Sequence, residues 1–193
     1  MKKVPSENLL PCDGKAFYFP DFFDGQFRSV HASIEWESKK VFLFGKWVNQ
    51  PRLMAWYGDQ NAVYTYSGLK NNPKPWNDVL TLVRQNLQDT LGVNFNSVLC
   101  NLYRDGNDSM GWHQDNEPEL GAEPVIASVS LGATRRFRLR HKFNKAIKPI
   151  SIDLEHGSLL VMQGKTQEYW QHQIPKTKRS VNSRINLTYR NII

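Results

Sequence analysis

The chain has 193 residues, of which 40% are hydrophobic and 22% charged, and its formal net charge is +7. This length suffices for one domain with a sizeable core. No stretch reaches the roughly 18 apolar residues of a membrane span, and the first residues lack the apolar run of a signal peptide. Cys12 and Cys100 match no metal-binding spacing and predict reduced thiols. We therefore expect an intracellular protein without a membrane partner, and its basic charge favours a polyanion as partner.

The first half of the chain mixes predicted strands and helices. A short strand is expected at 15–20, and apolar residues recurring at helical spacing predict an amphipathic helix over about 21–36. Asn77 is placed to cap a second helix, whose apolar stripe runs to Gly92, a residue suited to end it. Between the two helices, short β-like runs separated by turn residues lie at 41–44, 52–57 and 62–66.

From residue 96 onward the pattern changes to short strands at regular spacing, which indicates a sandwich or jelly roll rather than a parallel sheet. The expected strands are 97–103, 110–115, 125–131, 136–141, 149–154, 158–162, 168–173 and 184–190. We predict one mainly β domain with flanking helices over residues 1–193. A jelly-roll core over about 96–193 would follow an N-terminal α+β portion over about 1–95.

His113 and Asp115 form a His-x-Asp pair after a polar turn. Residues two apart in a strand point to the same face, so both side chains can reach one point in space. One imidazole and one carboxylate make up two thirds of the facial triad that holds non-haem Fe(II). The tripeptide alone is common. Of the remaining histidines, spacing favours His172 as a third ligand and leaves open His31, His141 and His156.

The C-terminal strand alternates strictly between polar and apolar residues. Its polar face carries two arginines, an amide and a hydroxyl, namely Arg184, Asn186, Thr188 and Arg190. Guanidinium groups pair bidentately with carboxylate or phosphate. This face therefore predicts an anion-binding wall.

Together these motifs resemble the signature of the AlkB-type Fe(II)/2-oxoglutarate-dependent dioxygenases, in particular their DNA-repair branch. The signature consists of HxD at 113–115, the later His172, and RxNxTxR at 184–190. Further shared segments extend the resemblance over residues 15–193: Phe44-Gly45-Lys46-Trp47, Pro51-Arg52, Tyr57-Gly58-Asp59, Tyr64-Thr65-Tyr66-Ser67-Gly68 and Pro73-Lys74-Pro75-Trp76. The resemblance implies a double-stranded β-helix core preceded by an extension that recognises nucleotides.

The resemblance also implies a role for each site residue. His113, Asp115 and His172 would bind Fe(2+). Arg184 would pair with the distal carboxylate of the cosubstrate 2-oxoglutarate, and Tyr103 would help there. The rest of the cosubstrate site would consist of Asn101 and Arg190 at the keto-acid end, with Asn186 and Thr188 in support.

A base inside a duplex must be flipped out to reach a buried metal. By the same resemblance, Tyr66 and His113 would stack on the flipped base, with Tyr64 and Thr65 in the same segment. Glu117, with Asn116, would face its edge, although residue type alone favours an exposed loop acid there. Phe44 in the Phe44-Gly45-Lys46 hairpin would fill the vacated stack, where burial statistics alone favour a core residue. Arg52 would contact the backbone of the partner strand, and further phosphate contacts are expected from Arg136, Arg138, Arg140, Lys176, Lys178 and Arg179.

The expected activity is oxidative demethylation of 1-methyladenine and 3-methylcytosine in single- or double-stranded DNA. It would consume O2 and 2-oxoglutarate and release formaldehyde, succinate and CO2. Two alternatives stay open, a dioxygenase of the same fold acting on RNA or another substrate, and a damaged-DNA-binding module without turnover. We expect a monomer in the cytoplasm or nucleoid of a bacterium, or in the nucleus of a eukaryote.

Overall fold

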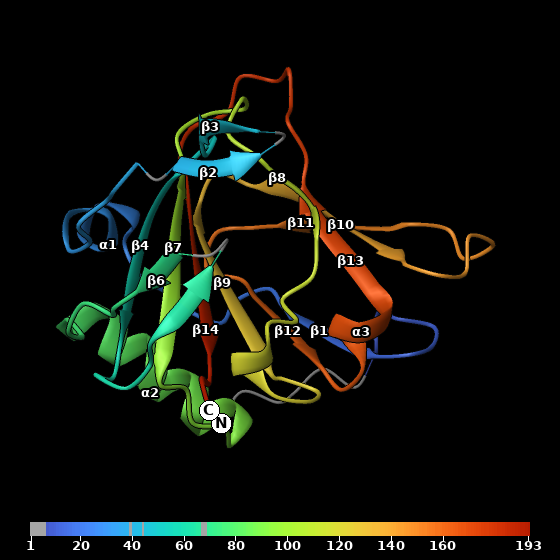
Figure 1. Cartoon of the computed structure of the whole chain (residues 1–193), viewed down its shortest axis with the longest axis horizontal. Coiled ribbons are helices and arrows are strands. Elements are labelled where there is room, and N and C mark those ends of the chain that lie inside the picture. Colours follow the sequence, from blue (N-terminus) through green and yellow to red (C-terminus); the bar gives the residue numbers. More distant parts are fainter. Residues whose placement is uncertain (1–6, 39, 44, 67–68) are drawn as a thin grey trace.

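Two antiparallel sheets form the centre of the computed structural model, which describes residues 7–38, 40–43, 45–66 and 69–193 (Figure 1). The larger sheet has the strand order β1 (Lys15–Phe19), β12 (Leu159–Gln163), β9 (Ile126–Gly132), β14 (Arg184–Arg190), β7 (Ser97–Tyr103) and β4 (Leu53–Gly58). The smaller sheet has the order β11 (Ile150–Leu154), β10 (Arg135–His141), β13 (Trp170–Ile174) and β8 (Met110–His113). These sheets confirm the predicted jelly roll, and all eight strands expected after residue 96 are present, with starts within two residues of the predicted ones.

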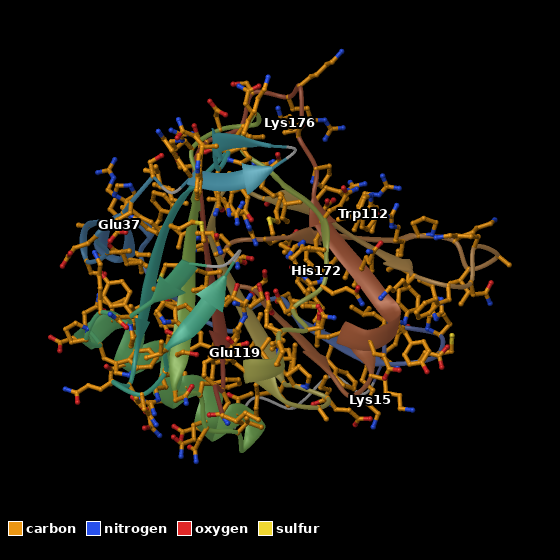
Figure 2. The ribbon with its side chains drawn as sticks, viewed as in Figure 1. Lys15, Glu37, Trp112, Glu119, His172 and Lys176 are labelled. Atoms are coloured by element: carbon orange, nitrogen blue, oxygen red, sulfur yellow. The ribbon has the colours of Figure 1, made fainter. Side chains whose placement is uncertain are left out.

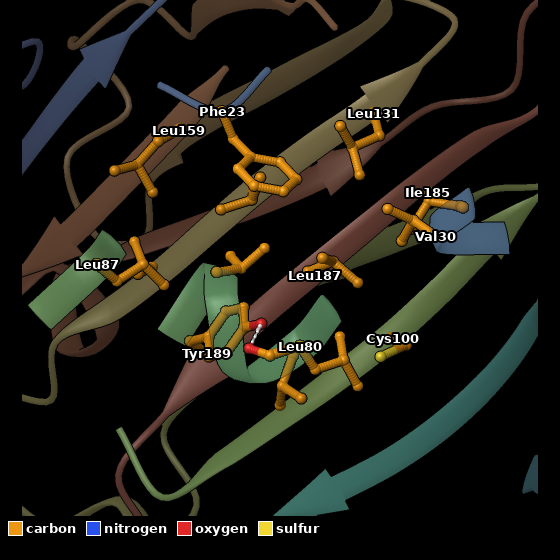
Figure 3. Packing of buried hydrophobic residues seen from close by; sticks show 14 of the residues in the cluster. Phe23, Val30, Leu80, Leu87, Cys100, Leu131, Leu159, Ile185, Leu187 and Tyr189 are labelled. Carbon is orange, nitrogen blue, oxygen red and sulfur yellow. Dashed lines mark hydrogen bonds between the residues drawn. The ribbon is translucent and has the colours of Figure 1, made fainter. Parts of the chain in front are cut away.

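The central strand β14 is buried on both faces, and its alternation explains why. Ile185, Leu187 and Tyr189 pack into a core cluster beneath the helices. The Tyr189 hydroxyl donates a 2.8 Å hydrogen bond to the Leu80 carbonyl, so that the polar end of this buried ring is satisfied (Figure 3). The polar face of β14 turns toward the smaller sheet and lines a cavity.

Helix α2 (Asp78–Leu91) covers that core and begins and ends as predicted. The Asn77 side chain accepts a hydrogen bond from the Leu80 N–H at 2.9 Å, and Gly92 ends the helix in the left-handed conformation at φ 67°. Its apolar stripe buries Val83 and Leu87 completely. The helix therefore packs against the apolar face of the larger sheet, and the opposite face, with the polar residues of β14, is available for the site.

The predicted helix over 21–36 is wrong in extent, because α1 spans only Phe27–Ala32. The amides of Phe22 and Phe23 both donate to the Gly157 carbonyl at 2.9 Å, in the turn between β11 and β12. Their rings enter the core from this loop. The apolar spacing that predicted a longer helix therefore comes partly from residues that pack into the core from a loop.

Two small hairpins precede α2. One pairs β2 (Lys40–Leu43) with β3 (Lys46–Asn49), and the other pairs β5 (Tyr64–Tyr66) with β6 (Leu69–Asn71). Strands β3 and β6 were not predicted; all four residues of β3 are exposed, so burial imposes no alternation on it. The expected strand 110–115 ends at His113, and part of 168–173 is the one-turn helix α3 (Thr166–Tyr169). A 3-10 turn, η1 (Pro118–Leu120), follows β8.

Both cysteines are free thiols, as predicted; Cys12 is exposed and Cys100 lies in the core. Across the described ranges, no helix combines the length and apolar character needed to cross a bilayer.

Candidate active site

A cavity of about 60 Å³ lies between the two sheets. The larger sheet contributes the polar face of β14, and the smaller sheet contributes β8 and β13. His172 lies near the middle of the molecule in the view of Figure 2, on the β13 side of this space. The residues that line the cavity are Arg52, Leu99, Asn101, Tyr103, Met110, His113, Asp115, Ser128, Phe137, Met162, His172, Gln173, Ile174, Arg184, Asn186, Thr188 and Arg190.

His113, Asp115 and His172 meet at one end of the cavity. His113 and His172 are direct partners across the β8–β13 ladder, and their ring centroids are 4.1 Å apart. Asp115 lies beyond the end of β8. Its Oδ1 lies 3.9 Å from His113 Nε2, and its Oδ2 lies 3.9 Å from His172 Nε2. One possible ligand atom from each residue lies within 4.8 Å of the others. The structure therefore brings together the three predicted ligands, although Asp115 does not lie in the strand as expected.

The local hydrogen bonding suits a divalent cation. His113 Nδ1 lies 2.8 Å from the Gly111 carbonyl. In a neutral ring this contact puts the proton on Nδ1 and leaves the Nε2 lone pair for a metal. Two imidazoles and a carboxylate on one side of a cavity leave further coordination positions open, as the facial triad requires. The donor set and its geometry thus fit Fe(2+).

The electrostatics favour the protonation states that a metal site needs. Burial raises the pKa of Asp115, but the charge of Arg190 is the main cause that lowers it, its hydrogen bond to the carboxylate adds to this, and the pKa falls to about 2. Burial, reinforced by His113, lowers the pKa of His172 to about 3. At neutral pH the site thus presents an ionised carboxylate and an uncharged His172 imidazole.

The polar face of β14 forms the opposite wall through a chain of hydrogen bonds. Arg184 Nη2 donates to Ser130 Oγ at 2.8 Å and to Asn186 Oδ1 at 2.7 Å, and Asn186 Nδ2 donates to Thr188 Oγ1 at 2.6 Å. Arg190 Nη2 donates to Asp115 Oδ1 at 2.8 Å, and this hydrogen bond connects the wall to the cluster of possible metal ligands. The predicted arginine wall is therefore continuous with the triad.

Arg184 has two buried nitrogens without a hydrogen-bond partner among the described residues. The residue is 1% exposed, and its Nε and Nη1 have no hydrogen-bond partner among the described residues. Burial lowers its pKa to about 10, so it stays charged at neutral pH. Since an unpaired buried cation is costly, these free N–H donors suit a carboxylate ligand. Tyr103, its cross-strand partner in β7, lies with its ring centroid 5.3 Å from the guanidinium carbon.

Asn101 and Arg52 complete this wall. Asn101 is the cross-strand partner of Asn186, and its side-chain oxygen accepts a 2.7 Å hydrogen bond from Arg52 Nε. Arg52 is 4% exposed and lines the cavity. The expectation that Arg52 contacts the backbone of a partner strand does not agree with this buried position, because a contact with a second DNA strand requires an exposed guanidinium.

Of the residues expected to recognise the base, His113 lines the cavity, whereas Asn116 and Glu117 do not. Asn116 is exposed and Glu117 is half-buried, in the turn that leads into η1. Glu117 Oε2 is buried, with no hydrogen-bond partner among the described residues. Tyr64, Thr65 and Tyr66 form β5. In the other hairpin Gly45 has a φ of 78° and Lys46 is exposed, whereas Phe44 lies outside the described residues.

Three supporting residues were not predicted. Ser128 and Ser130, on one face of β9, hydrogen-bond to Asn186 and Arg184 respectively. Their spacing of two in a buried strand was an available signal. Gln167 Oε1 accepts the backbone N–H of Asp115 at 3.0 Å. Nothing in the sequence links these two residues, which lie 52 positions apart.

Comparison with known proteins agrees with this geometry. Residues 23–190 match the family model of the 2OG-Fe(II) oxygenase superfamily. The chain is 42% identical over 193 residues to mouse "DNA oxidative demethylase ALKBH2", covering 95% of this chain and 81% of that protein. It is 41% identical over 177 residues to bovine "Alpha-ketoglutarate-dependent dioxygenase alkB homolog 3", covering 88% of this chain but only 61% of the relative. A solved structure, "The structure of OsALKBH1", has a TM-score of 0.56 at 18% identity, covers 95% of this chain and 86% of that one, and supports the fold.

Proposed function

The chain belongs to the 2OG-Fe(II) oxygenase superfamily as an AlkB-type member, and from this premise we propose that it removes N-linked methyl groups from bases in DNA. It is an Fe(II)/2-oxoglutarate-dependent dioxygenase, and we infer that 1-methyladenine and 3-methylcytosine are its substrates. The observation that carries the proposal is the pair of buried, unpartnered Arg184 nitrogens in the same small cavity as the His113, Asp115 and His172 cluster. This pairing suits a ligand that is a metal chelator at one end and a carboxylate at the other.

His113, Asp115 and His172 are the proposed ligands of Fe(2+). A bound Fe(2+), with 2-oxoglutarate and O2, would supply the oxidising power to hydroxylate the methyl group; formaldehyde would then leave the base, and succinate and CO2 would be the other products. The chain's part is to hold the metal and both substrates in place and to exclude water. The 2.8 Å ion pair with Arg190 keeps the Asp115 carboxylate ionised and fixes one of its oxygens.

Arg184 and Tyr103 are the proposed partners of the distal carboxylate of 2-oxoglutarate. Arg184 Nε and Nη1 carry N–H donors without a partner among the described residues, and such donors form strong, charge-assisted hydrogen bonds with a carboxylate. Asn101 and Arg190 are assigned to the keto-acid end, nearer the triad. Asn186 and Thr188 support the wall, since their hydrogen bonds orient the Arg184 guanidinium.

For the nucleic acid, we assign the stacking of a flipped base to Tyr66 and His113, with Tyr64 and Thr65 beside them. Glu117 and Asn116 are assigned to the base edge, because a carboxylate attracts the positive charge of these methylated bases. The hairpin of Phe44, Gly45 and Lys46 is the proposed wedge that would support activity on duplex DNA.

A groove of about 610 Å³ suits the phosphate backbone. Its basic side chains include Arg138, Lys176 and Arg179, and the half-buried Arg140 lies close by with its guanidinium carbon 4.2 Å from the ring centroid of Trp112. Arg136 also lines the groove but is ion-paired with Asp153, so we assign it a smaller share of phosphate binding. Basic side chains along a groove provide the sequence-independent part of nucleic-acid affinity. We infer that the chain acts as a monomer in the compartment that contains the cell's DNA.

The decisive experiment supplies Fe(2+), 2-oxoglutarate and O2 with oligonucleotides carrying 1-methyladenine. We expect formaldehyde, succinate and unmethylated adenine in equal amounts. The matched control is Asp115→Ala, which should abolish all three products while the protein stays folded. Methylated DNA bound without formaldehyde release would refute the proposal and favour a binding module. Parallel arms with single-stranded DNA, duplex DNA and RNA identify the substrate, and turnover on RNA alone would refute DNA as the substrate.

A further inference from the structure

The one-turn helix α3 lies against the segment that carries Asp115. Gln167 in α3 is 2% exposed, and its Oε1 accepts the Asp115 N–H at 3.0 Å. In the opposite direction, Gln114 Nε2 donates to the carbonyls of Gln167 and Glu168 at 2.6 and 3.1 Å. Three hydrogen bonds thus join α3 to two adjacent residues next to His113.

Asp115 depends on this contact because it lies outside the sheet. Strand β8 ends at His113, and the β8–β13 register runs only from His172–His113 to Ile174–Met110, with a bulge between. Asp115 is nevertheless 5% exposed. A buried amide that lacks a strand partner needs another acceptor. The side chain of Gln167 is the acceptor that the described structure provides.

Helix α3 is itself held rigidly. The buried Thr166 hydroxyl contacts the Gln163 carbonyl at 2.6 Å and both backbone groups of Lys15 at 2.9 and 3.0 Å. A Cβ on Gly14 would lie 2.6 Å from that hydroxyl, so a larger residue would displace it. At the other end, Trp170 Nε1 donates to the Cys12 carbonyl at 3.1 Å. Because α3 is held at both ends, it can fix the position of a loop residue that hydrogen-bonds to it.

From these contacts we infer that Gln167 is a positioning residue for the metal site, which sets the place of the Asp115 carboxylate by holding its backbone. His172 follows the same helix by a few residues, so α3 sets the positions of two of the three proposed ligands. The inference rests on the proposed function, because it takes Asp115 as a ligand. Gln167 itself touches none of the proposed ligand atoms, since its contact is with the backbone.

The test is the affinity for Mn²⁺, measured by calorimetry well below the melting temperature. Gln167→Met keeps the length of the side chain but removes the amide oxygen. We expect it to weaken Mn²⁺ binding by about 10- to 100-fold, the usual effect of losing a group that orients a metal ligand. Gln85→Met, on the exposed face of α2, is the matched control and should bind Mn²⁺ as the wild type does.

A purely structural role for Gln167 predicts a different result, a lower melting temperature with unchanged Mn²⁺ affinity. Affinity within about threefold of wild type would therefore overturn the inference and leave the proposed function standing. Failure of the wild-type protein to bind Mn²⁺ would instead refute the proposed metal site. If Gln167→Met does not fold, hydrogen exchange of the wild-type Asp115 amide decides, because slow exchange supports the contact and the rate of an open loop amide overturns it.

Discussion

Replacing Arg184 by methionine should separate cosubstrate binding from every other property of the protein. Methionine fills similar space but removes the N–H donors of Nε and Nη1, which are buried and without a partner among the described residues. Each hydrogen bond to a charged group contributes about 1.5–3 kcal/mol, so losing two costs at least about 3 kcal/mol. That loss corresponds to a KM for 2-oxoglutarate raised on the order of 100-fold or more.

The free energy of unfolding of the apo-protein should fall by no more than about 2 kcal/mol. Arg184 is 1% exposed, and replacing a buried charge by an apolar side chain is often neutral for folding. The variant does remove the donor to Ser130 and one of the donors to Asn186, at a cost of about 1 kcal/mol each. Methylated DNA should bind as it does to the wild type, since no proposed DNA contact is altered.

The assay is succinate formation as a function of 2-oxoglutarate concentration, with thermal unfolding measured in parallel. Arg104→Met is the matched control, because Arg104 is half-exposed, pairs with Asp108 and does not line the cavity. It should leave the KM for 2-oxoglutarate unchanged. A KM within about threefold of wild type in Arg184→Met would refute the assignment of Arg184 to the carboxylate, given the energy of two charged hydrogen bonds.

Three further changes probe other parts of the chain. Phe44→Ala should reduce demethylation of duplex DNA about tenfold more than that of single strands, because a wedge offsets an unstacking cost of a few kcal/mol; equal losses on both would exclude the wedge. Asn77→Ala removes the cap on the Leu80 amide and should cost about 1 kcal/mol, seen as a melting temperature lower by about 2–4 °C. Burial raises the pKa of Asp108, but hydrogen bonds from Arg104 outweigh it and the pKa is lowered. The stability that this pair contributes is present above the unfolded pKa of about 3.9 and is lost as the pH falls through the folded value. Asp108→Asn should therefore be less stable than wild type in urea unfolding at pH 7, and the gap should close toward pH 3; a gap independent of pH would contradict the argument.

The catalytic half of the fold was predictable because burial imposes a pattern on it. Strand β14 was predicted at both ends, since a central strand with a polar site on one face and a core on the other must alternate. Helix α2 was predicted because its cap and its terminal glycine are local signals. The segment around α1 was not, because Phe22 and Phe23 are held by a carbonyl from a distant turn. No local pattern records such a contact.

The candidate site, like the fold, was predictable only in part. Its three proposed metal ligands were predicted from residue spacing and family resemblance. In the structure, the ladder between β8 and β13 brings His113 and His172 together. The reason that Asp115 joins them was not predictable. The strand stops two residues short of Asp115, and a side chain from α3 replaces the missing strand partner. Spacing thus identified a residue that does join the cluster of possible ligands, but for a reason that is only partly correct.

The charges in the cavity also constrain where each substrate can bind. Three guanidiniums, those of Arg52, Arg184 and Arg190, face one carboxylate, that of Asp115, so these four groups together carry two excess positive charges. A divalent metal adds two more. A dianion such as 2-oxoglutarate relieves this excess, and a ligand that binds only the folded state stabilises it by about 2.7 kcal/mol at 100 times its dissociation constant. A cationic methylated base would be repelled from the same place. On the proposed function we therefore expect the base to approach from the Glu117 side, where a buried carboxylate oxygen has no partner among the described residues.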